Sequence, residues 1–177
     1  MSLKESNINI NWEKELSEIK SIKESANLAQ QLSEQVKYIN IFINIIKSTK
    51  SAIAWRSAWV LDIFERHNKK ALLPYINQIT EILLQTPHHG VQRHLTRILS
   101  SIHPKYLTDG RIIDSCFNWL LNPNTPVAIK VNAMQIISNL CTVYPELKPE
   151  LKTVILEGYK TGTAGFKSRA NKILKKL

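Results

Sequence analysis

The chain has 177 residues, of which 44% are hydrophobic and 21% charged, and its formal net charge at pH 7 is +10. This length and composition predict one globular domain and exclude a disordered chain. No apolar run approaches the roughly 18 residues that a membrane span requires, and the N-terminal stretch lacks the apolar core and cleavage site of a secretory signal.

The first element in chain order is a stretch rich in serine, lysine and glutamate, residues 1–34. We expect it to be helical. Two interpretations stay open for it: an N-terminal cap on the structure that follows, or a tether that docks on a larger assembly. Terminal units of repeat arrays are commonly atypical because their outer face meets water.

Residues 35–177 contain apolar stripes that recur at nearly constant spacing. Each first helix places three apolar residues at offsets of 0, 4 and 7, which fall on one helical face. Four stripes have this form: Ala54, Ala58 and Leu61; Val91, Leu95 and Ile98; Ile129, Ala133 and Ile136; and Phe166, Ala170 and Ile173. Their first residues lie 37, 38 and 37 positions apart.

A second helix is predicted in each unit from a further stripe at offsets of 22, 25 and 29. The stripe runs through Ile76, Ile79 and Leu83, then Ile113, Cys116 and Leu120, and weakens in the third unit, where Leu151 and Val154 are followed by Gly158. The same register projected backwards gives Ile39, Phe42 and Ile46. Proline- and glycine-containing loops separate these helices. The predicted units are 52–88, 89–124 and 125–162, with a final helix at 164–177.

Basic residues follow the start of the first three stripes: Arg56 precedes Ala58, Arg93 precedes Leu95, and Lys130 precedes Ala133. With the two-helix period, this pattern resembles HEAT or armadillo repeats. The resemblance implies an all-α fold, a right-handed superhelix of about four stacked antiparallel helix pairs. An irregular helical bundle is the alternative fold, which the constant spacing disfavours. Two helix starts are also predicted: Asp109 as a cap near Arg111, and Thr125 as a cap before Pro126.

The resemblance implies that second helices line the concave surface. Residues beside their apolar stripe include Tyr75, Ile82 and Trp119, with Arg111 at the start of the same helix as Trp119. We expect these four residues to bind a protein or peptide partner. The alternative is that the aromatic and aliphatic side chains pack between neighbouring repeats.

Positive charge is concentrated after residue 50. Residues 51–177 carry 17 Lys and Arg against 8 Asp and Glu. This excess favours an acidic protein partner, with nucleic acid as the alternative. The sequence of the last helix offers a basic patch for an acidic partner. The favoured alternative is a solvated face that caps the last repeat, where the helix dipole stabilises cations. The patch comprises Lys167, Arg169, Lys172, Lys175 and Lys176.

A catalytic alternative rests on "WRSAWVLD", in which Trp55, Trp59 and Asp62 fall on one helical face. HEAT-like alkylpurine DNA glycosylases combine tryptophans with an aspartate, and the resemblance to them implies base stacking and charge stabilisation by these three residues. The same face is also where packing between repeats is expected. The second helices lack the basic lining that phosphates require.

No further chemistry is predicted. The spacing of the histidines does not match a helical zinc site, and no glycine-rich phosphate loop occurs, so we expect neither a metal nor a cofactor. Cys116 and Cys141 lie in apolar helical patterns, which favours buried free thiols and a cytoplasmic location. The sequence therefore predicts a non-enzymatic binding or scaffold module, with nucleic-acid binding as the alternative.

Overall fold

A computed structural model of the chain describes residues 10–48 and 52–177. Residues 1–9, part of the predicted N-terminal cap or tether, lie outside this description. The α-helices are α1 (Trp12–Glu18), α2 (Ile22–Glu34), α3 (Ile39–Ser48), α4 (Ala52–Leu72), α5 (Ile76–Gln85), α6 (His89–Ser101), α7 (Arg111–Leu121), α8 (Val127–Leu140), α9 (Leu147–Thr161) and α10 (Ala164–Leu174). Short 3₁₀ turns occur at Val36–Tyr38, Leu73–Tyr75 and Pro104–Tyr106, and the described residues contain no strand.

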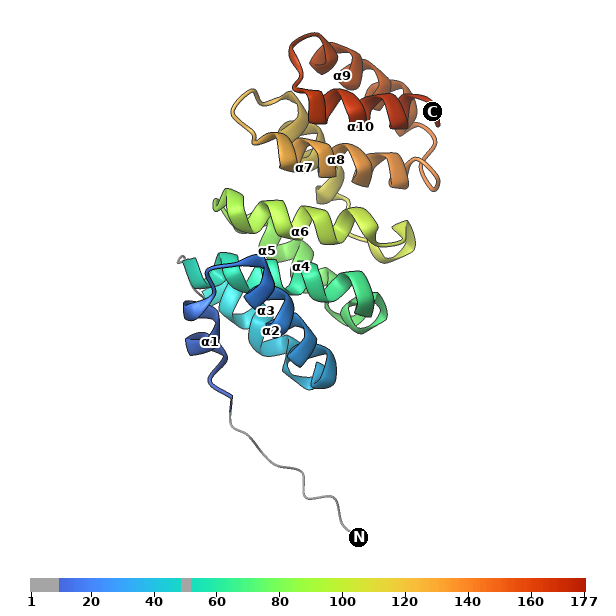
Figure 1. Cartoon of the computed structure of the whole chain (residues 1–177). Helices are drawn as coiled ribbons and strands as arrows, with labels where there is room; N and C mark the ends of the chain where they lie inside the picture. The colour runs from blue at the N-terminus through green and yellow to red at the C-terminus, as the bar shows by residue number, and fades with distance from the viewer. Residues whose placement is uncertain (1–9, 49–51) are drawn as a thin grey trace.

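The helices stack in two layers (Figure 1). Helices α2, α4, α6, α8 and α10 pack side by side in one layer, which we call the first-helix layer. Helices α3, α5, α7 and α9 form the second-helix layer, and each lies against the first helix of the following pair. The all-α, HEAT-like fold predicted from the spacing is thereby confirmed.

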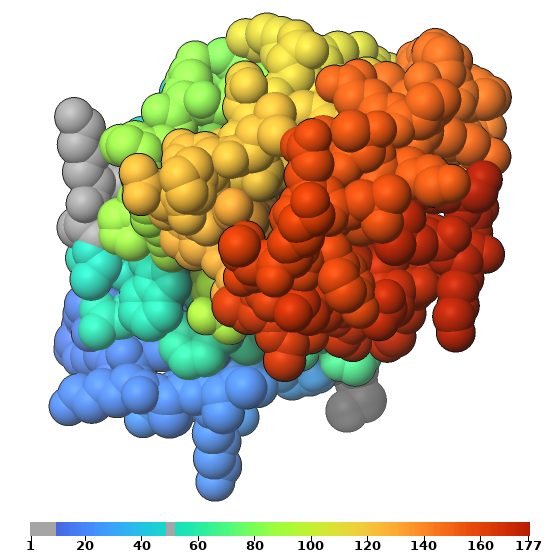
Figure 2. Space-filling view, turned by 90° about the horizontal axis from the view of Figure 1, so that it is seen from above, coloured from blue at the N-terminus to red at the C-terminus, as the bar shows by residue number. Residues whose placement is uncertain are grey.

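Successive pairs are displaced sideways along the stack. Figure 2 looks down on the molecule from the C-terminal end, and earlier repeats stay visible beside the later ones. Such an offset is typical of repeat arrays, in which each pair buries its apolar face against a neighbour.

The repeating stripes form the core. All twelve first-helix stripe residues from Ala54 to Ile173 are buried, and so are Ile39, Phe42 and Ile46 of the projected earlier register. Burial of these side chains removes apolar surface from water at every contact between repeats, which is the main favourable contribution to folding. No helix in the described part of the chain is long and apolar enough to span a membrane.

Local capping sets where several helices begin. The Ser21 side chain accepts a hydrogen bond from the N–H of Glu24, whose carboxylate in turn accepts one from the N–H of Ser21, completing a capping box at α2. The prediction for Asp109 is wrong by one residue, since Gly110 occupies the cap position of α7, although Asp109 Oδ1 does accept a hydrogen bond from the Arg111 N–H at 3.0 Å. The prediction for Thr125 is wrong by one residue, since Pro126 occupies the cap position of α8.

Candidate functional site

A cleft with a volume of about 650 Å³ lies on the first-helix layer. It draws residues from five helices of that layer. The lining comprises Ile22 of α2; Trp55, Trp59, Asp62 and Arg66 of α4; Arg93, His94 and Arg97 of α6; Val127, Ala128, Val131 and Asn132 of α8; and Gly165 of α10. The cleft therefore brings together residues that are more than 100 positions apart in the chain.

One wall of the cleft is an aromatic platform made by Trp55, Trp59 and His94. The two indoles lie one turn apart on α4 and stack with ring centroids 5.5 Å apart and an interplanar angle of 23°. His94 of α6 continues the stack, 6.2 Å from Trp59 at 21°. Gly90 makes room for this platform, because a Cβ atom there would lie 2.5 Å from Cδ1 of Trp55. Half-buried indole faces can bind an aromatic, apolar or cationic group.

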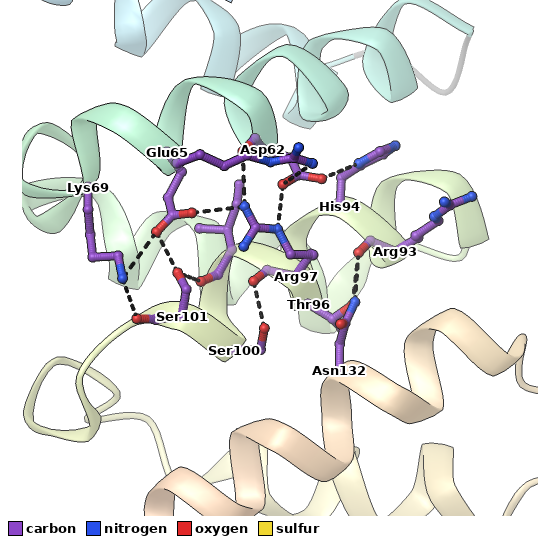
Figure 3. Close-up of polar contacts among 12 residues, drawn as sticks. Asp62, Glu65, Lys69, Arg93, His94, Thr96, Arg97, Ser100, Ser101 and Asn132 are labelled. Carbon is purple, nitrogen blue, oxygen red and sulfur yellow. Dashed lines mark hydrogen bonds and ion pairs between the residues drawn. The ribbon is translucent and has the colours of Figure 1, made fainter. Parts of the chain in front are cut away.

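Asp62 lies beneath the platform in the interface between α4 and α6. Its carboxylate accepts a hydrogen bond from His94 Nδ1 at 2.8 Å and another from Arg97 Nε at 2.6 Å (Figure 3). The imidazole nitrogen is the donor because an ionised carboxylate only accepts. Burial alone would raise the pKa of Asp62, but the hydrogen bond from His94 and the charge of Arg97 together hold that pKa below its ordinary value.

Glu65, one turn further along α4, extends this network. Arg97 Nη2 donates to Glu65 Oε2 at 3.0 Å, and the Ser101 hydroxyl donates to the other Glu65 oxygen. Lys69 lies 3.7 Å from Glu65 and donates to the backbone carbonyl of Ser101 at 2.9 Å. Both buried carboxylates of α4 are thus neutralised by α6, and the two helices are held in one register.

A second polar contact joins α6 to α8. Asn132 donates to the Arg93 carbonyl at 3.3 Å and to the Thr96 hydroxyl at 3.2 Å, while Asn139 donates to the Ser100 carbonyl at 2.8 Å. Because Asn132 also lines the cleft, these contacts hold the α8 side of the cleft against α6; the bonds of Asn132 are drawn in Figure 3.

Two cleft arginines keep most of their charge uncompensated. The side chain of Arg66 is 51% exposed and lies 3.7 Å from Asp62 Oδ1, an oxygen that Arg97 already contacts more closely. Arg93 is exposed, and within residues 10–48 and 52–177 its guanidinium forms no ion pair. In Figure 3 its side chain extends away from the network around Asp62. The cleft is therefore electropositive and has hydrogen-bond donors to spare.

The catalytic alternative named Trp55, Trp59 and Asp62, and the structure brings all three to this cleft. Arg66, Arg93 and His94 were not predicted as site residues. Spacing offered a signal for Arg66, since it continues the face of Trp55, Trp59 and Asp62 by one more turn. No sequence signal placed Arg93 and His94 beside that face, because they come from another helix.

The predicted second-helix residues lie elsewhere. Ile82 is only 7% exposed, and Tyr75 and Trp119 are half-buried and packed against the core. Arg111 is exposed and forms ion pairs with Asp109 and Glu81, whose hydrogen bonds raise the pKa of its guanidinium. None of the four lines the first-helix cleft.

The predicted C-terminal basic residues divide into two kinds. Arg169 Nη1 donates to Gln135 Oε1 at 2.6 Å and so ties α10 to α8, and Lys167 lies over the ring of Tyr159 at 5.6 Å. Lys172, Lys175 and Lys176 are exposed, the last two beyond the end of α10.

The described residues contain no group of three or more histidine, cysteine or acidic side chains able to hold a metal ion. Cys116 and Cys141 are free and buried, and burial raises the pKa of both thiols. Because the thiolate is the reactive form, neither cysteine is suited to act as a nucleophile.

Comparison with known proteins adds one match. A family model describing a HEAT repeat domain matches residues 12–177, which includes both helix layers and every residue of the cleft. No curated protein and no solved structure matches the chain significantly.

Proposed function

Because this chain belongs to the HEAT repeat family, whose repeats generally mediate protein–protein interactions, we propose that it is a non-enzymatic binding module. Its ligand is an acidic segment of a partner protein, held in the first-helix cleft. The observation that carries this proposal is the aromatic platform of Trp55 and Trp59 beside the uncompensated charges of Arg66 and Arg93. Complementary charge would steer the partner, and burial of apolar surface would supply affinity.

The apolar rim of the cleft favours a polypeptide. Ile22 and Val127 both line the cleft, and they are 66% and 41% exposed. An acidic segment that also carries aliphatic or aromatic side chains would cover both these residues and the indoles. A nucleic-acid backbone would leave the aliphatic groups facing phosphates.

Two contacts favour binding over base-excision chemistry. Asp62 is buried, and its oxygens already accept hydrogen bonds from His94 and Arg97. Trp55 and Trp59 stack on each other, so no base can enter between them. A carboxylate occupied in this way is poorly placed to stabilise a charge developing on a substrate.

Nucleic-acid binding without catalysis is the second candidate. It is favoured by the aromatic faces lying next to arginines, an arrangement that suits stacked bases and a phosphate backbone. The free thiols of Cys116 and Cys141 fit a reducing compartment, and we propose a cytoplasmic location for either function.

Selection from a random peptide library tests the proposal. Wild-type protein is the bait, Arg93→Glu is the loss-of-charge variant, and Lys152→Glu is the control, an exposed residue of α9 with the same change in charge. We expect selected peptides to combine acidic with aliphatic or aromatic residues. They should bind wild type and the control equally, and bind Arg93→Glu about tenfold or more weakly.

Three outcomes would contradict this expectation. Peptides that bind Arg93→Glu as well as wild type do not use the cleft. Loss of binding in Trp119→Ala, with helicity retained, would move the partner to the second-helix layer. A single-stranded oligonucleotide that outcompetes the peptides, with affinity falling steeply as salt rises, would favour the second candidate.

A further inference from the structure

We propose that the segment bound in the first-helix cleft carries a phosphoryl group on one of its side chains, so that the protein distinguishes a phosphorylated partner from its unmodified form. The inference rests on the proposed function of the cleft and specifies the ligand more closely. It follows from the balance of charge in the cleft, from the direction of the surrounding helices and from the apolar surface beside the arginines.

The positive charge of the cleft exceeds its negative charge, so a ligand with more than one negative charge can bind there. Arg97 is committed to Asp62 and Glu65 by hydrogen bonds of 2.6 and 3.0 Å. Arg66 and Arg93 retain free donors, since the first makes only a 3.7 Å contact and the second extends away from the network. A phosphate monoester carries about −1.5 to −2 charges at pH 7 and three acceptor oxygens, whereas a carboxylate carries one charge. Two guanidinium groups that retain unused donors match the monoester better.

The helices of the first layer add to the positive potential. They run in the same direction through the stack (Figure 1), and the cleft lining includes the N-terminal ends of α2, α8 and α10 and the middle of α4 and α6. Ile22 and Val127 are the first residues of α2 and α8, and Gly165 is the second residue of α10. Helix dipoles place partial positive charge at these ends. This potential reinforces that of the two arginines and belongs to the same cleft.

The apolar surface next to the arginines can contact the parts of a peptide that surround a phosphoryl group. The faces of Trp55 and Trp59 and the exposed side chain of Val127 line the same cleft. A free phosphate ion would use the charges and leave these groups in water. A phosphorylated side chain in a peptide would satisfy the guanidinium donors and cover the apolar groups together.

Binding of two matched peptide libraries tests the inference. Nine-residue peptides carry a central phosphoserine or phosphotyrosine and a fluorescent label, and the control libraries carry the unmodified residue. Fluorescence anisotropy gives the affinities, with inorganic phosphate and a single-stranded oligonucleotide as competitors. We expect the phosphorylated libraries to bind about tenfold more tightly, inorganic phosphate to compete only at far higher concentration, and Lys152→Ala to leave the preference intact.

Variants of the two arginines then locate the phosphoryl group. Arg66→Ala and Arg93→Ala should each remove most of the preference, and Arg93→Lys should restore only part of it because lysine cannot form the bidentate contact. Circular dichroism checks that each variant is folded. Equal affinity for both libraries, a preference that survives both alanine variants, or tighter binding of the oligonucleotide would overturn the inference. If acidic peptides still need Arg93 while phosphorylation adds nothing, this inference fails and the proposed function stands.

Discussion

At the scale of single residues, Asp62 links the repeat that contains α4 to the next repeat, which begins with α6. It is buried, and its hydrogen-bond partners His94 and Arg97 both belong to α6, so these bonds form only when α4 and α6 are docked. Within α4 its charge meets only that of Arg66, 3.7 Å away. Among the described residues, the nearby Arg93 side chain forms no ion pair with this network and extends away from it (Figure 3). A substitution at Asp62 should therefore affect mainly stability, and a substitution at Arg93 mainly binding. Loss of a buried charge leaves its partners unpaired, whereas loss of an exposed charge has little effect on folding.

Asp62→Asn should lower the free energy of unfolding by about 2 kcal/mol at neutral pH. We expect a smaller loss of stability than for a fully buried ion pair, because the Arg97 side chain is 30% exposed to solvent. Urea denaturation measures the change, and Arg93→Ala, the control, should stay within about 0.5 kcal/mol of wild type. Equal stability of Asp62→Asn and wild type would contradict this role.

A comparison of wild type with Asp62→Asn also predicts how the free energy of unfolding depends on pH. The pKa of Asp62 is held below its ordinary value of 3.8, so the ionised carboxylate stabilises the fold above that value. This contribution is lost as the pH falls through the lowered pKa. The stability difference between wild type and Asp62→Asn should therefore narrow at pH values below 3.8.

At the scale of helices, α9 and α10 show how a break in the sequence pattern is compensated in space. The apolar stripe of the second helices weakens at Gly158, where an earlier unit has Leu120. The ring of Phe166 occupies that space: a Cβ on Gly158 would lie 2.8 Å from it, and a Cβ on Gly162 would lie 2.7 Å from it. Phe166 is also the largest residue to begin a first-helix stripe. The large residue and the two glycines form one packing unit.

Gly158→Ala and Gly162→Ala should each destabilise the protein by about 1–3 kcal/mol, because the added methyl group overlaps a buried ring. At Gly162 it would also meet the backbone oxygen of Gly158 at 2.8 Å. Gly110→Ala is the matched control, since nothing lies within 4 Å of a Cβ there, and it should be neutral or slightly stabilising. Thermal denaturation compares the three variants. A Gly158→Ala protein as stable as wild type would show that Phe166 can move aside.

At the scale of the whole molecule, contacts run between neighbours along the stack. Helix α10 packs on α8 and α9, α8 packs on α6, and α6 packs on α4. Polar contacts follow the same order, from Asp62 and Arg97 between α4 and α6 to Arg169 and Gln135 between α8 and α10. In such a quasi-one-dimensional array, stability is the sum of the units and of the interfaces between adjacent units.

A chain ending at Thr163, and so lacking α10, should lose protection against hydrogen exchange chiefly in α8 and α9. The truncation removes the buried Phe166, Ala170 and Ile173, and α10 packs chiefly on those two helices. Amides of α2, α3 and α4 should keep their protection, and they are the internal control. Loss of protection throughout the chain would mean that the repeats fold as one indivisible unit.

The sequence alone determined the layered helical fold and its core. The spacing of 37 or 38 residues and the offsets within each stripe are local properties of the chain, and every first-helix stripe residue they identify is buried. A face of α4 carrying Trp55, Trp59 and Asp62 was likewise visible from helical periodicity, because residues three or four apart share a side.

Only the tertiary structure decided what this face meets. Helical period specifies which side of a helix a residue occupies, but the offset between stacked pairs determines which side chains of the next helix come opposite. That offset places His94 and Arg97 on Asp62, leaves Arg66 with only a 3.7 Å contact to Asp62 and Arg93 outside the network, and brings Ile22 and Gly165 to the same cleft. It also places this cleft on the first-helix layer, and Tyr75, Ile82, Arg111 and Trp119 do not line it. Contacts between repeats arise from many weak packing interactions along two helices at once, and no short stretch of the sequence contains them.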